Sequence, residues 1–421
     1  MIKHYFQSQF LRNIITLMTG AVIAQVIPLL ASPLLTRIYT PEDFGIFALY
    51  AAITGILVVI SSGRYELAIM LPKKEKDALA LTVLSGFLTL VISLLSFILI
   101  LIFKNQLVEN IDSNLKYFIW IVPLGLLFNG MFQILNSLTN RKQLFKNTSF
   151  SKVTQSSATI GFQIILNVFK LSGIGLISGK VIGDLIAFIY LLIIHISRKT
   201  FKRVKDSLKN IRNNAITYKD FPRYQALSAF LNQLSQHMPA IILSFYYSPQ
   251  IAGFYALTTR ILSAPIRLIG ISTREVFYQK ASEMHANGES FFRLYIKTTL
   301  GLAKIGIIPF ILFGVFASWI FVALFGEDWY SSGVYAQIII SWSFFLFINS
   351  PTTTSIYILN LQKFGLKFEI FSVIIRLLSL LSGYYFLNSH YFSIAFFAFS
   401  GVFLNLFLIL YIYRKLKGNE K

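Results

Sequence analysis

The sequence contains no cysteine, and only five of its 421 residues are histidine. The absence of cysteine excludes disulfide bonds, thiolate nucleophiles and thiolate metal ligands. The histidines are scattered and show no metal-ligand spacing, so we predict neither a metal site nor a cofactor. Chemistry that depends on thiols or bound metal ions is therefore not indicated by this sequence.

Charged residues are also scarce. They make up 13% of the chain against 55% hydrophobic residues, whereas soluble domains contain about 25% charged residues. Acidic residues are the rarest class, with 17 Asp and Glu against 38 Lys and Arg. The mean hydropathy of +0.66 agrees with this balance. The composition predicts a polytopic membrane protein.

Segments of about 20 apolar residues, the length that crosses the hydrocarbon core as a helix, recur along the whole chain. We place twelve spans, at 14–36, 44–63, 79–103, 117–138, 150–169 and 172–196 in the first half and at 224–247, 251–273, 294–324, 334–358, 368–386 and 392–413 in the second. A single segment that crosses lipid can form all its backbone hydrogen bonds internally only when it is a helix. The sequence therefore predicts an all-α protein with twelve transmembrane helices.

Lysine and arginine gather in alternate loops. They are dense at the N-terminus, in the loops after even-numbered spans and in the C-terminal tail, for example at Lys73, Lys74, Arg141 and Lys142, and they are sparse in the opposite loops. The positive-inside rule then places both termini in the cytoplasm. The net charge of +21 is explained by this topology, and we expect no nucleic-acid partner.

One phrase occurs twice in the chain. Residues 39–49, which begin Tyr-Thr-Pro, return as residues 247–257, which begin Tyr-Ser-Pro, and Gln25 matches Gln233 at the same offset. An even number of spans separates the copies, so the halves are predicted to be parallel repeats with the substrate path between them. We assign an N-terminal six-helix bundle to 1–197, a basic cytoplasmic linker to 198–223 and a C-terminal six-helix bundle to 224–421. The alternative is a chance match between apolar segments.

Away from their ends, the expected spans contain five cations and one carboxylate, namely Lys180, Asp184, Arg260, Arg267, Lys304 and Arg376. A charge at the bilayer centre costs about 2.5 to 3.5 kcal/mol on insertion scales, so these groups should face water or one another. Arg260 and Arg267 share one helix face and lie too deep to reach the headgroups easily. For Lys304 and Arg376, which are nearer the inner ends, snorkelling is the alternative.

Lys180 and Asp184 are spaced to pair along their own helix, and a self-neutralising ion pair explains them as well as a transport role does. The other cations would line a water-filled passage. Such a passage suits an anionic cargo, for example a sugar-bearing lipid diphosphate, because arginine grips phosphate with two donors and lysine acts as a point charge. Only Asp184 is available at this depth for coupling transport to H⁺ or Na⁺.

Uncharged polar residues in the spans are further candidates for the lining of this passage. They are Gln25 in the first span, Asn129 and Gln133 in the fourth, and Asn232, Gln233 and Gln236 in the seventh. Amides hydrogen-bond sugar hydroxyls, but they equally form interhelical hydrogen bonds of about 0.6 kcal/mol. Both interpretations stay open at this point.

Two inner helix ends place an arginine close to a glutamate. Arg64 and Glu66 follow the second span, and Arg274 and Glu275 follow the eighth at nearly the same offset. Each pair could bridge the halves as a gate. The alternative, a surface salt bridge worth less than about 1 kcal/mol, is favoured for Arg274 and Glu275.

At these residues the chain resembles a known family. The run 35–45, the Arg64-Tyr65-Glu66 phrase and the run 252–257 followed by Arg260 are similar to those of bacterial polysaccharide flippases. The resemblance implies membership of the multidrug/oligosaccharidyl-lipid/polysaccharide exporter superfamily, with two six-helix bundles in a V-shaped, alternating-access arrangement. It also implies a location in the bacterial inner membrane, as a multi-pass protein.

The resemblance implies that the cargo is an undecaprenyl-diphosphate-linked repeat unit of O-antigen or a similar glycan, moved from the cytoplasmic to the periplasmic leaflet. The implied partners are a glycan polymerase and a chain-length regulator. An ion-coupled small-molecule exporter of the same superfamily is the alternative, although the acidic residues it would need are missing. We expect a transporter rather than an enzyme, because no outward loop is long enough for a folded catalytic domain.

Overall fold

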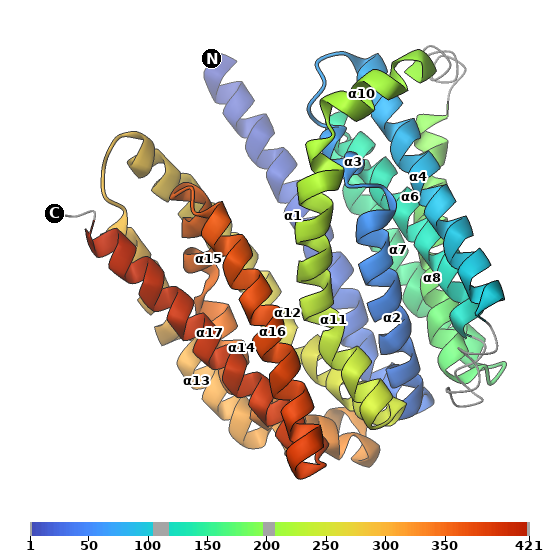
Figure 1. Ribbon diagram of the computed structural model, residues 1–421, viewed down its shortest axis with the longest axis vertical. Coiled ribbons are helices and arrows are strands. Elements are labelled where there is room, and N and C mark those ends of the chain that lie inside the picture. Colours follow the sequence, from blue (N-terminus) through green and yellow to red (C-terminus); the bar gives the residue numbers. More distant parts are fainter. Residues whose placement is uncertain (1, 104–117, 197–206, 419–421) are drawn as a thin grey trace. The chain divides into compact units, whose positions relative to one another are not determined.

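The computed structural model describes residues 2–103, 118–196 and 207–418, and all regular elements in these ranges are helices (Figure 1). The chain divides into two compact units, Met1–His237 and Met238–Lys421. The first unit contains α1 (Ile2–Ile38), α2 (Pro41–Ser61), α3 (Tyr65–Ala68), α4 (Glu75–Ile102), η2 (Phe118–Ile121), α6 (Val122–Arg141), α7 (Phe145–Asn167), α8 (Ser172–His195), η3 (Leu208–Asn210), α10 (Ile211–Thr217) and η4 (Phe221–Gln225).

Helix α11 (Ala226–Tyr246) begins in the first unit and ends in the second. The second unit continues with α12 (Pro249–Ala286), α13 (Phe292–Phe325), η5 (Glu327–Trp329), α14 (Tyr330–Ile348), α15 (Ser350–Ile358), α16 (Gln362–Leu387) and α17 (His390–Gly418). Because this division does not test the expected bundle and linker boundaries at 197 and 223, those boundaries stay a prediction.

Within the described ranges, nine helices are long and apolar enough to cross a membrane. They are Thr16–Ile38, Pro41–Ser61, Glu75–Ile102, Phe118–Arg141, Ser172–His195, Phe292–Phe325, Glu327–Ile348, Gln362–Leu387 and His390–Gly418. The three other expected spans are helical in α7, α11 and α12 but do not combine the same length, hydropathy and low charge. The all-α fold and the multi-pass membrane character are confirmed, and the count of twelve spans stays a prediction.

The repeated phrase forms the same helix start in both units. Thr40 caps α2, its hydroxyl accepting from the backbone N–H of Asp43 while the Asp43 carboxylate accepts from the N–H of Thr40. Ser248 caps α12 by accepting from the N–H of Ile251. A proline follows each cap, where its missing N–H costs no helical hydrogen bond. The two phrases are therefore alike in structure as well as in sequence.

A row of glycines brings α8 against α7. Gly175, Gly179 and Gly183 recur every fourth residue and so share one face of α8. A Cβ added at Gly179 would lie 2.7 Å from the backbone nitrogen of Gln163, and one at Gly183 would lie 2.8 Å from the carbonyl oxygen of Gln155. Small residues allow such close approach in membrane helices. Asp184 directly follows Gly183 in the sequence, on the adjoining side of α8.

The second unit has an aromatic core. Trp329, Tyr335 and Phe321 are almost completely buried, and the ring of Phe254 packs edge-on against those of Trp329 and Tyr335. Helices α16 and α17 meet at Gly383, where a Cβ would lie 2.3 Å from the backbone of Ser393. The close contact of the last two helices thus depends on a glycine, as it does in the first unit.

The expected linker is only partly described, because residues 198–206 lie outside the described ranges. The remainder forms the short helices η3, α10 and η4, which belong to the first unit. The side-chain amides of Asn210 and Asn214 donate to a carboxylate oxygen of Asp77, at 2.8 and 3.2 Å. The hydroxyl of Tyr65 donates to the carbonyl oxygen of Ala215. This stretch is therefore held against α3 and α4.

Candidate functional site

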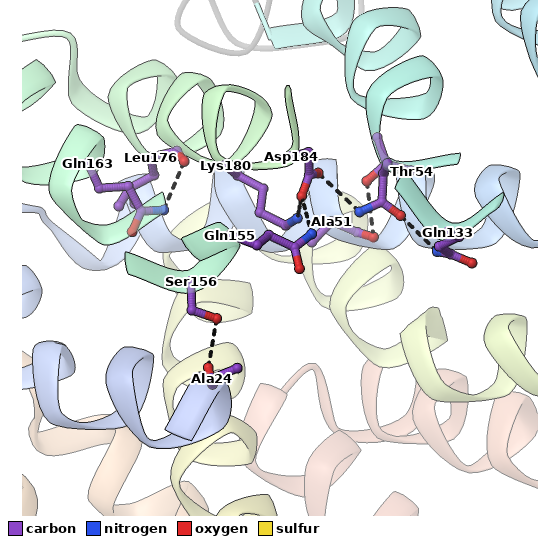
Figure 2. Close-up of polar contacts among 11 residues, drawn as sticks. Ala24, Ala51, Thr54, Gln133, Gln155, Ser156, Gln163, Leu176, Lys180 and Asp184 are labelled. Carbon is purple, nitrogen blue, oxygen red and sulfur yellow. Dashed lines mark hydrogen bonds and ion pairs between the residues drawn. The ribbon is translucent and has the colours of Figure 1, made fainter. Parts of the chain in front are cut away.

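Three helices of the first unit bring polar side chains together around one carboxylate. Figure 2 shows Lys180 and Gln155 converging on Asp184. Lys180 forms an ion pair with the carboxylate of Asp184, the Gln155 amide donates to it at 2.6 Å, and the Asn129 amide donates to its other oxygen at 3.0 Å. We call Asn129, Gln155, Lys180 and Asp184 the Asp184 cluster. Its members come from α6, α7 and α8.

The cluster continues along α6. The amide of Gln133, one turn after Asn129, donates to the Asn129 side-chain oxygen at 2.8 Å. Fixing that oxygen as an acceptor leaves the Asn129 amide nitrogen to serve as the donor to Asp184. The buried phenol of Tyr50, from α2, lies close enough to interact electrostatically with Asp184. The carboxylate is therefore surrounded by side chains of four helices.

Burial explains why Asp184 is given so many donors. Its side chain is 2% exposed, whereas that of Lys180 is 31% exposed. A buried carboxylate is stable as an ion only when it is paired and hydrogen-bonded. One ammonium and two amides supply these partners. The ion pair has no net charge. The Lys180 side chain extends towards the exposed surface of the unit, and the Asp184 side chain stays buried.

Sequence reasoning identified Lys180, Asp184, Asn129 and Gln133 but missed Gln155. The signal was present, because α7 carries the polar run Thr154, Gln155, Ser156 and Ser157 in the first half of an expected span. Contacts with other helices account for much of this polarity. Ser156 donates to the carbonyl oxygen of Ala24 in α1 at 2.7 Å (Figure 2). The polar face of α7 therefore turns towards α1 and α8 rather than lipid.

The four other expected cations lie on three helices of the second unit, and the contacts that the structure describes do not bring them into one cluster. Arg260 and Arg267 lie on α12, where Arg260 is half-buried and Arg267 is exposed. Lys304 is exposed on α13. Arg376 of α16 is half-buried, with its guanidinium carbon 5.9 Å from the ring centre of Trp342. Their roles in cargo binding stay a prediction.

Arg376 is the expected cation with the most defined surroundings. Its guanidinium lies over the indole of Trp342, which is a cation–π arrangement. Trp342 in turn packs edge-on against Phe397 and lies close to Gly401, where a Cβ would be 2.5 Å from the indole ring. The ring that supports Arg376 is thus fixed by α17. This arrangement keeps a positive charge half-buried inside the second unit.

The remaining polar candidates are placed as follows. The Gln236 amide donates to the side-chain oxygen of Asn232 at 2.6 Å, and both residues are exposed on α11. Gln25 of α1 and Gln233 of α11 are half-buried. On the same stretch of α11, the ring of His237 lies against Gly55 of α2. These amides do not form a single site with the Asp184 cluster in the contacts that the structure describes.

The first expected gate pair forms inside a single turn. Arg64 and Glu66 make an ion pair at 3.3 Å, and Glu66 also accepts a hydrogen bond from Ser62. Gly63 and Arg64 both adopt positive φ, at 60° and 59°, which reverses the chain between α2 and α3. Arg274 and Glu275 are both exposed on α12. Whether either pair acts as a gate is not tested by these contacts, so the gate stays a prediction.

Comparison with known families gives one match. The sequence profile of a family described as polysaccharide biosynthesis protein matches residues 34–334. This range contains the Asp184 cluster, both copies of the repeated phrase and the arginines of α12. No protein with a curated description matches the sequence.

Several solved transporter structures have the same fold. The lipid II flippase MurJ, in an inward closed conformation, matches with a TM-score of 0.72 and 14% identity, over 94% of this chain and 87% of that chain. An outward-facing multidrug resistance MATE family transporter of the MOP superfamily matches with a TM-score of 0.61 and 14% identity, over 97% and 96%. At such identities the likeness shows a shared fold.

A third structure with this fold is a MOP superfamily transporter from Pyrococcus furiosus. It matches with a TM-score of 0.56 and 13% identity, over 97% of this chain and 96% of that chain. It is described as having a binding pocket of reverse polarity, which suggests a different function for that protein.

Proposed function

Because the chain belongs to the family of polysaccharide biosynthesis proteins and has the fold of MOP-superfamily transporters, we propose that it is a flippase for a lipid-linked oligosaccharide. It is a multi-pass membrane protein and a transporter rather than an enzyme. The proposed cargo is an undecaprenyl-diphosphate-linked repeat unit of O-antigen or a similar surface glycan. The family match over residues 34–334 is the observation that carries this proposal.

The charge of the chain supports an anionic cargo. Asp184, the carboxylate that lies deep in an expected span, is paired with Lys180, and the other cations away from the span ends are Arg260, Arg267, Lys304 and Arg376. A diphosphate carries the opposite charge and accepts the two-pronged hydrogen bonds of arginine. In this proposal the cations line a lumen through which the head group passes, by alternating access, from the cytoplasmic to the periplasmic leaflet of the bacterial inner membrane.

The proposal includes a topology. Twelve spans form two parallel six-helix bundles with both termini in the cytoplasm, so the basic loops remain on the side where the cargo is made. A glycan polymerase and a chain-length regulator would act on the product after its transfer. Neither partner needs to bind this chain for the transfer itself.

Coupling to H⁺ or Na⁺ would require the Asp184 cluster to change during transport. The carboxylate already receives an ammonium and two amide donors. In such coupling, a proton or a sodium ion would bind the carboxylate after Lys180 moves away. The coupling ion and the Lys180 ammonium would otherwise compete for the same carboxylate oxygens. Coupling through Asp184 therefore predicts a step in which the ion pair opens.

A second candidate is an ion-coupled small-molecule exporter. The shared fold with MATE family transporters favours it, and so does the presence of one intramembrane carboxylate. The shortage of other acids counts against it, because a cationic substrate needs negative charge in its path. In this case Asp184 would bind the coupling ion, and the cations of the second unit would be structural.

Deletion of the gene in its host separates the two candidates. The flippase proposal predicts that one lipid-linked saccharide accumulates on the inner leaflet while surface glycan disappears, and that a plasmid copy restores both. Unchanged surface glycan and unchanged lipid-linked saccharides, together with increased sensitivity to toxic compounds, would support the exporter and overturn the flippase.

A further inference from the structure

The segment 207–225 carries exposed cations on one end of the first unit. Lys209, Arg212, Lys219 and Arg223 are all exposed, and within the described part of the chain no ion pair holds any of them. We call these four residues the basic collar. They belong to η3, α10, η4 and the turn between them. Their charge is therefore available to a partner outside the chain.

Hydrogen bonds and apolar packing hold the segment of the basic collar against α3 and α4. Asp77 of α4 receives the amides of Asn210 and Asn214, which lie one turn apart and face the same way. Tyr218 and Phe221 pack against the hydrophobic cluster that contains Tyr65 and Leu79. In Figure 1, α10 runs crosswise to α4 at the end of the unit. A short helix in this position would lie near one surface of a bilayer that α4 crosses.

Large apolar side chains are exposed among the cations. Leu208 is 49% exposed, Ile216 57% and Tyr224 68%. The stretch after α2 adds Leu67, Met70 and Leu71 on the neighbouring α3 side, all more than 40% exposed. In a linker surrounded by water, the exposure of these apolar side chains would be unfavourable. At the boundary between headgroups and acyl chains, the apolar residues insert while the cations remain at headgroup level.

We propose that the segment 207–225 is an interfacial anchor that binds anionic phospholipids through the basic collar. The charge complementarity is direct, because anionic headgroups attract juxtamembrane Lys and Arg. Leu208, Ile216 and Tyr224 would supply the apolar contact that an exposed cation alone lacks. The packing on Asp77 and Tyr65 then couples the anchor to α3 and α4. This inference does not depend on the identity of the transported cargo.

Because the chain has no cysteine, a spin label reacts only with a cysteine that is introduced. Ile216→Cys provides one labelling site, and a spin label there reports whether oxygen, which enters lipid, or a nickel chelate, which stays in water, reaches it. The protein is placed in nanodiscs of phosphatidylcholine alone or with phosphatidylglycerol. A label at Glu289→Cys, an exposed polar position between α12 and α13 in the second unit, is the control.

The anchor predicts that the label at position 216 is reached by oxygen better than by the chelate. Phosphatidylglycerol should raise this preference about twofold or more, and high salt should reduce the increase. Replacing Lys209, Arg212, Lys219 and Arg223 by Gln should abolish the phosphatidylglycerol dependence. The matched replacement of four exposed cations in the second unit, Arg293, Lys297, Lys363 and Lys367, should leave it intact.

Two outcomes would overturn the anchor. One is equal access of the chelate to positions 216 and 289 in both lipid mixtures, which would make the segment a water-exposed linker. The other is a response to undecaprenyl diphosphate added at one molecule per protein but not to phosphatidylglycerol, which would make the collar a cargo site. A failed gene-deletion test would leave the spin-label result unaffected, so the two proposals can fall separately.

Discussion

Lys180 and Asp184 form an ion pair across one turn of α8, and the aspartate is almost completely buried while the lysine is about a third exposed. The pair accounts for the one carboxylate that sequence analysis found inside the membrane. It also removes one cation from the set available to an anionic cargo. The roles of both residues can be separated by substitution.

Lys180→Met should destabilise the protein, because the Asp184 carboxylate then keeps only its two amide donors. We expect a loss of about 2 kcal/mol, since an unpaired buried charge is costly and Lys180 is partly exposed to solvent. Thermal unfolding in detergent measures the change. The double variant Lys180→Met with Asp184→Asn should recover most of the loss. A double variant as unstable as the single one would contradict a role based on charge.

Gly179→Ala should also destabilise the first unit, because its Cβ would lie 2.7 Å from the backbone nitrogen of Gln163. Backbone cannot move aside as a flexible side chain can, and overpacking of this kind costs about 1 to 3 kcal/mol. Gly161→Ala in α7 is the matched control, because nothing lies within 4 Å of its added Cβ. It should be neutral or slightly stabilising, since alanine favours helix. Equal effects at both glycines would rule out the tight crossing of α7 and α8.

Thr40→Ala should cost about 1 kcal/mol, because the side-chain cap of α2 disappears and Asp43 loses its hydroxyl partner. Ser248→Ala should cost less, since only one capping hydrogen bond is present there. Thr40→Ser retains the hydroxyl and should behave like the unaltered protein. Thermal unfolding of the three variants gives the order. If Thr40→Ser were as unstable as Thr40→Ala, the cap would not explain the effect.

Arg376→Gln should lower export of surface glycan, because it removes a half-buried cation that lies over Trp342. Arg376→Lys retains the charge but not the planar contact with the indole, so we expect an intermediate level. Surface glycan is measured at matched amounts of protein in the membrane. Equal glycan in the two variants and the unaltered protein would exclude Arg376 from cargo handling and leave it a structural residue.

Much of the fold was predictable because membrane helices leave a strong local signal. Long apolar runs marked the helices, and the repeated Tyr-Thr/Ser-Pro phrase marked the two capped starts at Thr40 and Ser248. The spacing of Lys180 and Asp184 marked an ion pair within one helix. These features depend on residues that are close in the sequence, so they can be recognised from a single sequence.

The remaining features depend on contacts between distant segments. Gln155 reaches Asp184 only because the glycines of α8 allow α7 to approach. The expected linker was predicted as a basic connection, yet Asn210 and Asn214 hold its described part on Asp77. Nothing in the local sequence indicates which helix such amides will meet.

The most direct test of the account is transfer of the cargo across the membrane by variants of α12. Proteoliposomes containing the host's lipid-linked saccharide are mixed with a membrane-impermeant enzyme that cleaves it, and the fraction protected inside is followed with time. The account predicts that Arg260→Ala with Arg267→Ala abolishes transfer, and that Arg260→Lys with Arg267→Lys retains part of it. Full transfer by the alanine variant would contradict a cationic passage for an anionic cargo.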